Sequence, residues 1–224
     1  MRWFPFAGTG GMRPDIKFCG LTRPEDAEAA SALGARYVGV IFAGGPRNIS
    51  PERARDVFAA VGEDTLRVGV FAKPDASVIV DAVRTAGLDV VQLHGDATPD
   101  AVTAVRDETG CQVWAVVRVA GATLPAAAAD LIDSADATLL DAKVDGKLGG
   151  TGVALPWRDL ADALHDVRGA REIVLAGGLT PANVRDAIDA LHPDIVDVSS
   201  GVESAPGIKD HERMREFAEA VWTV

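Results

Sequence analysis

The chain passes from a strand into a turn at Asp15-Ile-Lys-Phe-Cys-Gly-Leu-Thr22, a short apolar run that ends on a thiol. Because side chains alternate across a strand, Lys17 and Cys19 are expected on one face and their apolar neighbours on the other. Pro24 follows closely and suits the first turn of a helix. The stretch therefore predicts a strand followed by a helix, with a lysine beside a cysteine at the carboxyl end of the strand.

The same strand-and-helix unit recurs along the rest of the chain. Further strands are expected at 37–42, 66–71, 89–94, 112–119, 137–141, 172–176 and 195–198. Segments with helical spacing lie between them, including the Ala-rich stretch 124–134. About eight such units predict a single α/β domain, a (β/α)8 TIM barrel, over residues 15–224. Residues 1–14 carry no signal-peptide pattern and are interpreted as an N-terminal extension or a cloning remnant.

Composition narrows the classes of partner. The chain has 33 acidic and 22 basic residues and a formal net charge of -11, which argues against binding nucleic acid or an anionic membrane surface. No apolar run reaches the length needed to span a membrane. Two cysteines make neither a disulfide framework nor a zinc site, so the sequence predicts a reducing, cytoplasmic location.

Candidate functional residues gather at the carboxyl ends of the expected strands. In this fold those ends open on one rim, where active sites are built from the loops that follow. Two small-residue turns, Gly177-Gly178 and Ser200-Gly201, follow the last two strands, where barrels commonly hold a phosphate on backbone N–H groups. Cys111 falls at the opposite end of its strand and is interpreted as structural. The other candidates on the rim are Cys19, Arg47, His94, Asp141 and Asp197.

Eight short motifs occur in the order found in one enzyme family. They are Lys17-Phe-Cys-Gly-Leu-Thr22, Pro46-Arg-Asn-Ile-Ser50, Val68-Gly-Val-Phe71, Val91-Gln-Leu-His-Gly95, Leu139-Leu-Asp-Ala142, Gly149-Gly-Thr-Gly152, Ala176-Gly-Gly-Leu179 and Asp197-Val-Ser-Ser-Gly-Val-Glu203. From about Asp15 to the C-terminal helix, the chain thereby resembles the phosphoribosylanthranilate isomerases of tryptophan biosynthesis. The resemblance implies a cofactor-free Amadori rearrangement of N-(5-phosphoribosyl)anthranilate to 1-(2-carboxyphenylamino)-1-deoxyribulose 5-phosphate.

The resemblance also implies roles for particular residues. It makes Cys19 the general base, Asp141 the general acid and Arg47 the contact of the anthranilate carboxylate. An acid and a base suffice for the chemistry, because one protonates the ring oxygen of the sugar and the other removes a proton from the neighbouring carbon. The expected partner is a small phosphorylated substrate, with no metal or cofactor, and the protein is expected to be a monomer or a homodimer.

Neighbouring side chains are expected to adjust the acid and the base. A free thiol has a pKa near ~8.5, and Lys17 on the same strand face is expected to favour the thiolate of Cys19. Asp141 must hold a proton to act as an acid, which burial or a nearby carboxylate such as Asp197 would favour. His94 ends its strand pointing with Gln92 and is given a supporting role in the site or none.

Three other functions are weighed against this one. Asp141-Ala-Lys-Val-Asp145 resembles the Asp-x-Lys-x-x-Asp array of orotidine-phosphate decarboxylase barrels, but it is one residue short, and that enzyme has no use for Cys19. A related sugar-phosphate isomerase that accepts a second aminoaldose substrate is also consistent with the motifs. A catalytically silent binding barrel is disfavoured, because both the acid and the base are present.

Overall fold

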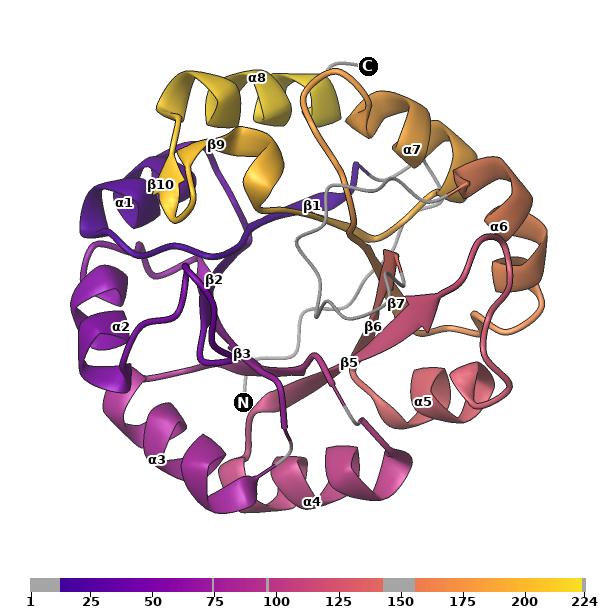
Figure 1. Cartoon of the computed structure of the whole chain (residues 1–224), viewed down its shortest axis with the longest axis horizontal. Coiled ribbons are helices and arrows are strands. Elements are labelled where there is room, and N and C mark those ends of the chain that lie inside the picture. Colours follow the sequence, from indigo (N-terminus) through magenta and orange to yellow (C-terminus); the bar gives the residue numbers. More distant parts are fainter. Residues whose placement is uncertain (1–12, 74, 96, 143–155, 223–224) are drawn as a thin grey trace.

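The protein is described by a computed structural model that covers residues 13–73, 75–95, 97–142 and 156–222. Eight parallel strands close into a barrel in the order β1 to β8, and helices surround it (Figure 1). The strands are β1 (Asp15–Phe18), β2 (Tyr37–Ile41), β3 (Leu66–Phe71), β4 (Val90–Leu93), β5 (Gln112–Val119), β6 (Ala137–Ala142), β7 (Glu172–Leu175) and β8 (Ile195–Val198). The helices are α1 (Pro24–Ala32), α2 (Pro51–Phe58), α3 (Ala76–Ala86), α4 (Pro99–Thr109), α5 (Ala128–Ser134), α6 (Trp157–His165), α7 (Val184–Leu191) and α8 (His211–Trp222). The prediction of a (β/α)8 barrel is confirmed.

The barrel closes where the first strand meets the last. β1 pairs in parallel with β8, and the register sets Lys17 opposite Asp197 and Phe18 opposite Val198. On its other side β1 pairs with β2, with Lys17 opposite Tyr37. Residues that lie 180 positions apart in the sequence therefore become neighbours on the inner wall.

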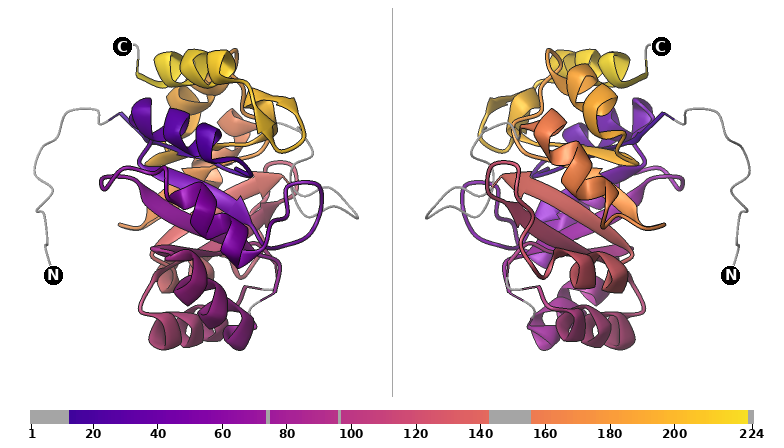
Figure 2. Two further views of the ribbon diagram at one scale, coloured as in Figure 1. Left: turned by 90° about the vertical axis from the view of Figure 1, so that its left-hand side faces the viewer. Right: turned by 90° about the vertical axis from the view of Figure 1, so that its right-hand side faces the viewer.

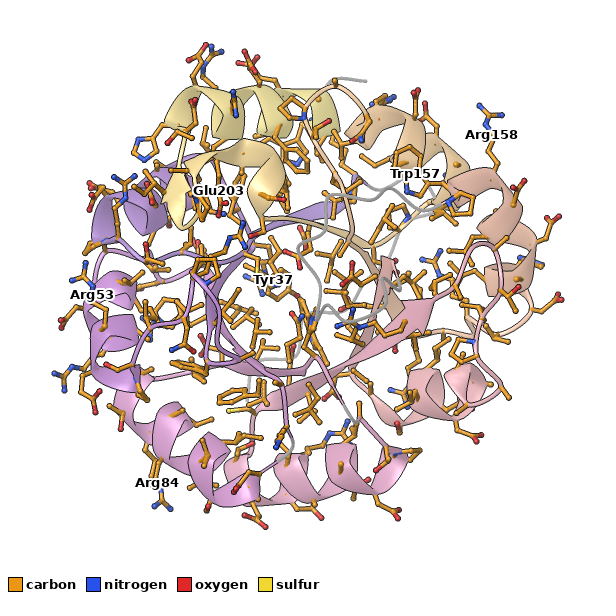
Figure 3. All side chains as sticks on the ribbon, in the orientation of Figure 1. Tyr37, Arg53, Arg84, Trp157, Arg158 and Glu203 are labelled. Carbon is orange, nitrogen blue, oxygen red and sulfur yellow. The ribbon has the colours of Figure 1, made fainter. Side chains whose placement is uncertain are left out.

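The expected alternation of β1 separates two layers of packing. Ile16 and Phe18 are fully buried in the large apolar cluster that includes the surrounding helices, and Phe18 meets Phe217 of α8 edge to face. A second, smaller cluster includes Tyr37 and Trp114, whose rings pack at 66° with centroids 4.8 Å apart. Figure 3 shows Tyr37 within the ring of strands. Large side chains thus fill the interior of the barrel beneath the site at its carboxyl end.

Two helices begin with a side-chain cap, and one begins later than predicted. Ser50 and Thr98 each precede a proline and accept a hydrogen bond from the backbone N–H three residues on. The helix predicted from residue 124 begins only at Ala128. Pro125 explains the delay, because a proline disfavours helical geometry in the residue before it, and the Pro125 carbonyl closes a turn with the N–H of Ala128.

A short hairpin between β8 and α8 was not predicted. The turn η1 (Ser200–Val202) leads into β9 (Glu203–Ala205), which pairs antiparallel with β10 (Ile208–Lys209). Both side views show this hairpin at the same end of the barrel as the loop between β2 and α2 (Figure 2). The hairpin therefore belongs to the rim that carries the candidate site. Among the helices that the structure describes, we find none with the length and apolarity needed to cross a membrane.

Candidate active site

A cavity of about 360 Å³ opens at the carboxyl ends of the strands. It brings together all of the predicted site residues except Lys17, which lies buried beside it. Gln92, Leu139 and Ser199 are among the further residues on its walls. The residues of the prediction that line it are Cys19, Arg47, His94, Asp141, Gly177, Gly178, Asp197, Ser200 and Gly201.

Cys19 follows β1 directly and lies beside a buried ion pair. Lys17 has no exposed surface, and its Nζ lies 2.8 Å from Oδ2 of Asp197. The backbone N–H of Cys19 donates to the carbonyl of Val198, which fixes the thiol against β8. Gly39 leaves the room for this arrangement, because a Cβ there would lie 3.0 Å from the Cys19 sulfur and 3.2 Å from Cε of Lys17. Thus β8 supplies the carboxylate that pairs with Lys17, and β2, through Gly39, leaves space for the side chains of Lys17 and Cys19.

Lys17 acts on Cys19 in the predicted direction, but burial outweighs it. Burial is the largest influence and raises the pKa of the Cys19 thiol; Lys17 lowers it, as expected, but Asp197 raises it again. The pKa of Cys19 therefore lies above its ordinary value. Burial alone would lower the pKa of Lys17, but attraction to Asp197 and Cys19 outweighs it, so that pKa is raised. Strand alternation predicted the position of Lys17 correctly, but it carries no information about the cost of burying a thiolate.

Asp141 lies on β6 between two basic side chains. Its Oδ2 is 3.6 Å from Nε2 of His94 and 3.6 Å from Nη1 of Arg118. The register of β5 and β6 sets Arg118 directly opposite Asp141. The sequence suggested burial, or a nearby carboxylate such as Asp197, as the influence on Asp141. Asp141 is buried, and Asp197 is ion-paired with Lys17. Arg118 was missed, although strand alternation from Trp114 would have placed it on the inner wall.

His94 is oriented by a residue of its own strand. Nε2 of the Gln92 side chain lies 3.3 Å from Nδ1 of His94, and Gln92 is almost completely buried. When the Gln92 amide donates to Nδ1, the proton of the neutral ring is on Nε2, the nitrogen that faces Asp141. Of the two alternatives that the sequence left open, a supporting role or none, this contact favours the supporting role.

Arg47 is held by a carboxylate of the hairpin. From the loop between β2 and α2, its Nε and Nη2 donate to the two oxygens of Glu203 at 2.8 and 2.7 Å. Gly20, at a φ of +73°, lies so close that a Cβ there would be 2.6 Å from Cδ of Arg47. Glu203 also accepts a hydrogen bond at 2.9 Å from Nζ of Lys209, which donates to the carbonyl of Ser199 as well. Sequence reasoning missed Glu203 and Lys209 as site residues, because Glu203 lies 156 positions from Arg47 and no local pattern links them.

The two small-residue turns meet on one wall of the cavity. Gly177 and Gly178 have φ angles of +88° and +66°, a conformation that glycine adopts without strain. A Cβ on Gly201 would lie only 1.9 Å from the carbonyl oxygen of Leu179, so the turn after β8 packs directly on the loop after β7. The third Gly-rich segment of the motif set, 149–152, lies outside the described residues, as do Lys143 and Asp145 of the decarboxylase-like array.

The closed barrel has a thiol and a carboxylate on the walls of one cavity at its carboxyl end, so it belongs to the class of (β/α)8 barrels equipped for acid–base catalysis. The sequence profile of the N-(5'phosphoribosyl)anthranilate (PRA) isomerase family matches residues 16–220. The chain belongs to this family, as its motifs indicated.

Individual relatives agree with this membership. An N-(5'-phosphoribosyl)anthranilate isomerase from Rubrobacter xylanophilus is 43% identical over 206 residues, which cover 92% of this chain and 97% of the relative. The crystal structure of phosphoribosyl anthranilate isomerase from Thermotoga maritima has a TM-score of 0.85 at 33% identity and covers 94% of this chain and 100% of its own. A phosphoribosyl anthranilate isomerase in complex with reduced 1-(o-carboxyphenylamino)-1-deoxyribulose 5-phosphate has a TM-score of 0.81 at 33% identity, with the same coverage.

Proposed function

We propose that the protein converts N-(5-phosphoribosyl)anthranilate to 1-(2-carboxyphenylamino)-1-deoxyribulose 5-phosphate in tryptophan biosynthesis. Family membership supports this reaction, and a relative binds the reduced form of its product. The observation that carries the mechanism is that Cys19 and Asp141, from strands well separated around the barrel, line one cavity. Loss of substrate fluorescence on adding freshly prepared N-(5-phosphoribosyl)anthranilate to the purified protein tests the proposal directly. Unchanged fluorescence would refute it.

The rearrangement needs only proton transfers. Asp141 gives a proton to the ring oxygen of the ribose as the bond from C1 to that oxygen breaks, and the anilino nitrogen becomes a protonated imine. Cys19, as thiolate, takes the proton from C2, and the resulting enol tautomerises to the ketone with a proton gained at C1. Atoms and electrons balance within the substrate, so the scheme requires no cofactor.

Arg47 is proposed to bind the anthranilate carboxylate. It lines the cavity and keeps its charge, since its pKa is raised, chiefly by the hydrogen bond to Glu203. A guanidinium can bind a carboxylate through two parallel N–H bonds, which fixes orientation as well as position. The contact would place the anilino nitrogen and C1 of the sugar between the acid and the base.

Replacing Arg47 by alanine is expected to remove about 2 to 4 kcal/mol of transition-state binding, measured as a fall in kcat/KM. Arg47→Lys keeps the charge but lacks the planar fork, so it should recover only part of the loss. Arg53→Lys, on the exposed outer part of α2, is the matched control and should be silent. Parental kcat/KM in Arg47→Ala would exclude the role.

The phosphate is proposed to lie on backbone N–H groups of the two packed turns, Gly177-Gly178 and Ser200-Gly201. Gly178→Asp should raise KM by more than about 10-fold, because like charges placed together cost several kcal/mol. Gly178→Asn is the control: it has the same size and must adopt the same positive φ, but it carries no charge. Equal KM values for the two variants would show that backbone strain, and no phosphate contact, causes the effect.

Two expectations from the sequence accompany the proposed function. A cytoplasmic location is supported by Cys19 and Cys111, both of which are free thiols. The protein is proposed to act as a monomer or a homodimer; a relative, the phosphoribosylanthranilate isomerase from Thermotoga maritima, is dimeric.

A further inference from the structure

We propose that Glu203 and Lys209 are positioning residues that orient Arg47 toward the carboxylate of the substrate. The inference rests on the proposed function of the site and concerns the β9–β10 hairpin, to which neither the sequence motifs nor the relatives assign a role. Figure 3 shows Glu203 on the side of the rim where this hairpin lies.

The first argument is the geometry of the guanidinium. Glu203 occupies the edge of Arg47 formed by Nε and Nη2, at 2.8 and 2.7 Å. The edge formed by Nη1 and the second N–H of Nη2 stays available for another planar acceptor. The two hydrogen bonds that Arg47 donates to Glu203 are called the Glu203 clamp below. Because Arg47 is only 16% exposed and lines the cavity, this clamp limits the directions in which the free edge can point. One carboxylate of the protein thus selects the edge that a carboxylate of the substrate can use.

The second argument is charge. A bare Glu203 would cancel the attraction of Arg47 for an anionic substrate, so a clamp of this kind needs a second cation. Lys209 supplies it: its Nζ is completely buried and lies 2.9 Å from Oε1 of Glu203. Burial raises the pKa of Glu203, but Arg47 and Lys209 outweigh burial and hold that pKa below its ordinary value, so Glu203 is ionised. Burial lowers the pKa of Lys209, and its attraction to Glu203 opposes that fall. With Lys209 charged, the three groups carry one net positive charge beside the cavity, which Arg47 lines.

The third argument is that the hairpin is itself fixed. The Lys209 backbone N–H donates to Asp26 at 3.3 Å, and Arg23 donates to the Lys209 carbonyl at 3.4 Å. Thr22 donates through Oγ1 to the carbonyl of Gly207 at 2.5 Å. These three contacts come from the loop after β1 and the start of α1. The hairpin that holds Arg47 is therefore anchored to the segment that follows Cys19, and this fixes the position of the carboxylate contact relative to the base.

The test compares two ligands on the intact protein. One is reduced 1-(o-carboxyphenylamino)-1-deoxyribulose 5-phosphate, and the other is the same compound without its carboxylate. For Glu203→Gln, the affinity for the carboxylated ligand should fall by roughly 10-fold to 100-fold, while the affinity for the second ligand stays within about twofold. Equal losses for both ligands, or no loss for either, would overturn the proposal, because a merely structural residue does not distinguish them.

Lys209→Met provides an independent test of the charge argument. It leaves Glu203 uncompensated beside Arg47, so preference for the carboxylated ligand should again fall. In the double variant Glu203→Gln/Lys209→Met the uncompensated charge is gone, so the preference should fall no further than in Glu203→Gln alone. Additive losses would contradict the charge argument. In an Arg47→Ala background, Glu203→Gln should leave the preference unchanged; a further fall would show that Glu203 acts without Arg47.

The parent protein separates this inference from the proposed function. If the parent neither turns over the substrate nor prefers the carboxylated ligand, the proposed function fails and the inference with it. If the parent does both and Glu203→Gln keeps the full preference, the proposed function stands and the inference alone fails.

Discussion

Asp141→Asn is expected to lower kcat by roughly 10²-fold to 10⁴-fold, the contribution of a positioned general acid. Asparagine keeps the shape of the side chain and can accept from His94 and Arg118, but it cannot transfer a proton to the ring oxygen. KM should change much less than kcat, because the lost interaction is made mainly in the transition state. Steady-state kinetics by the fluorescence assay, with circular dichroism to confirm the fold, measure both.

A matched control for this variant is Asp81→Asn, on the exposed face of α3. The same change in charge there should leave kcat and KM at parental values, which separates proton transfer from the general loss of a negative charge. Turnover of Asp141→Asn within a few-fold of the parent would remove Asp141 from the mechanism.

Cys19→Ser should lower kcat by a comparable factor, roughly 10²-fold to 10⁴-fold. Serine fits the space beside Gly39, but its hydroxyl is a far weaker acid than a thiol and supplies almost no anion at neutral pH. Cys111→Ser is the control, because Cys111 lies next to β5 at the opposite end of the barrel, where its sulfur donates to the carbonyl of Leu88. Activity that survives in Cys19→Ser but not in Cys111→Ser would reverse the assignment of the two cysteines.

The pH profile adds a second reading of Cys19. Burial raises the pKa of the thiol, so the reactive thiolate is the minor form at neutral pH and grows as pH rises. The value of kcat/KM should therefore increase with pH on the alkaline side of neutrality. This increase should be absent from Cys19→Ser over the same range, and its persistence there would assign it to another group.

The sequence predicted the fold well because the barrel repeats one local pattern. Strand alternation placed Lys17 with Cys19, and the rule that strand ends share a rim brought Cys19, Arg47 and Asp141 to one cavity. No local sequence pattern predicts which side chains pair with one another across the rim. Thus the contact of Arg47 with Glu203, across 156 positions, and the hairpin that presents Glu203 became evident only in three dimensions.

Electrostatics were the other part that the sequence could not supply. A lysine beside a cysteine suggests a lowered thiol pKa when both are pictured in water. In the folded protein Lys17 is shared with Asp197, and burial of Cys19 costs more than the lysine returns. The sign of such a balance depends on depth and on the third group, neither of which is a property of the strand in isolation.

The pairing of β1 with β8 also decides when the site can exist during synthesis of the protein. Ribosomes release the N-terminal strand first, so Cys19 and Lys17 emerge long before Asp197, Glu203 and Lys209 are translated. The ion pairs of Lys17 with Asp197 and of Arg47 with Glu203 can form only after β8 has closed the barrel. Long-range pairing of this kind is slow compared with local helix formation. Catalytic activity is therefore expected late in the synthesis of the chain, and during refolding its appearance reports closure of the barrel.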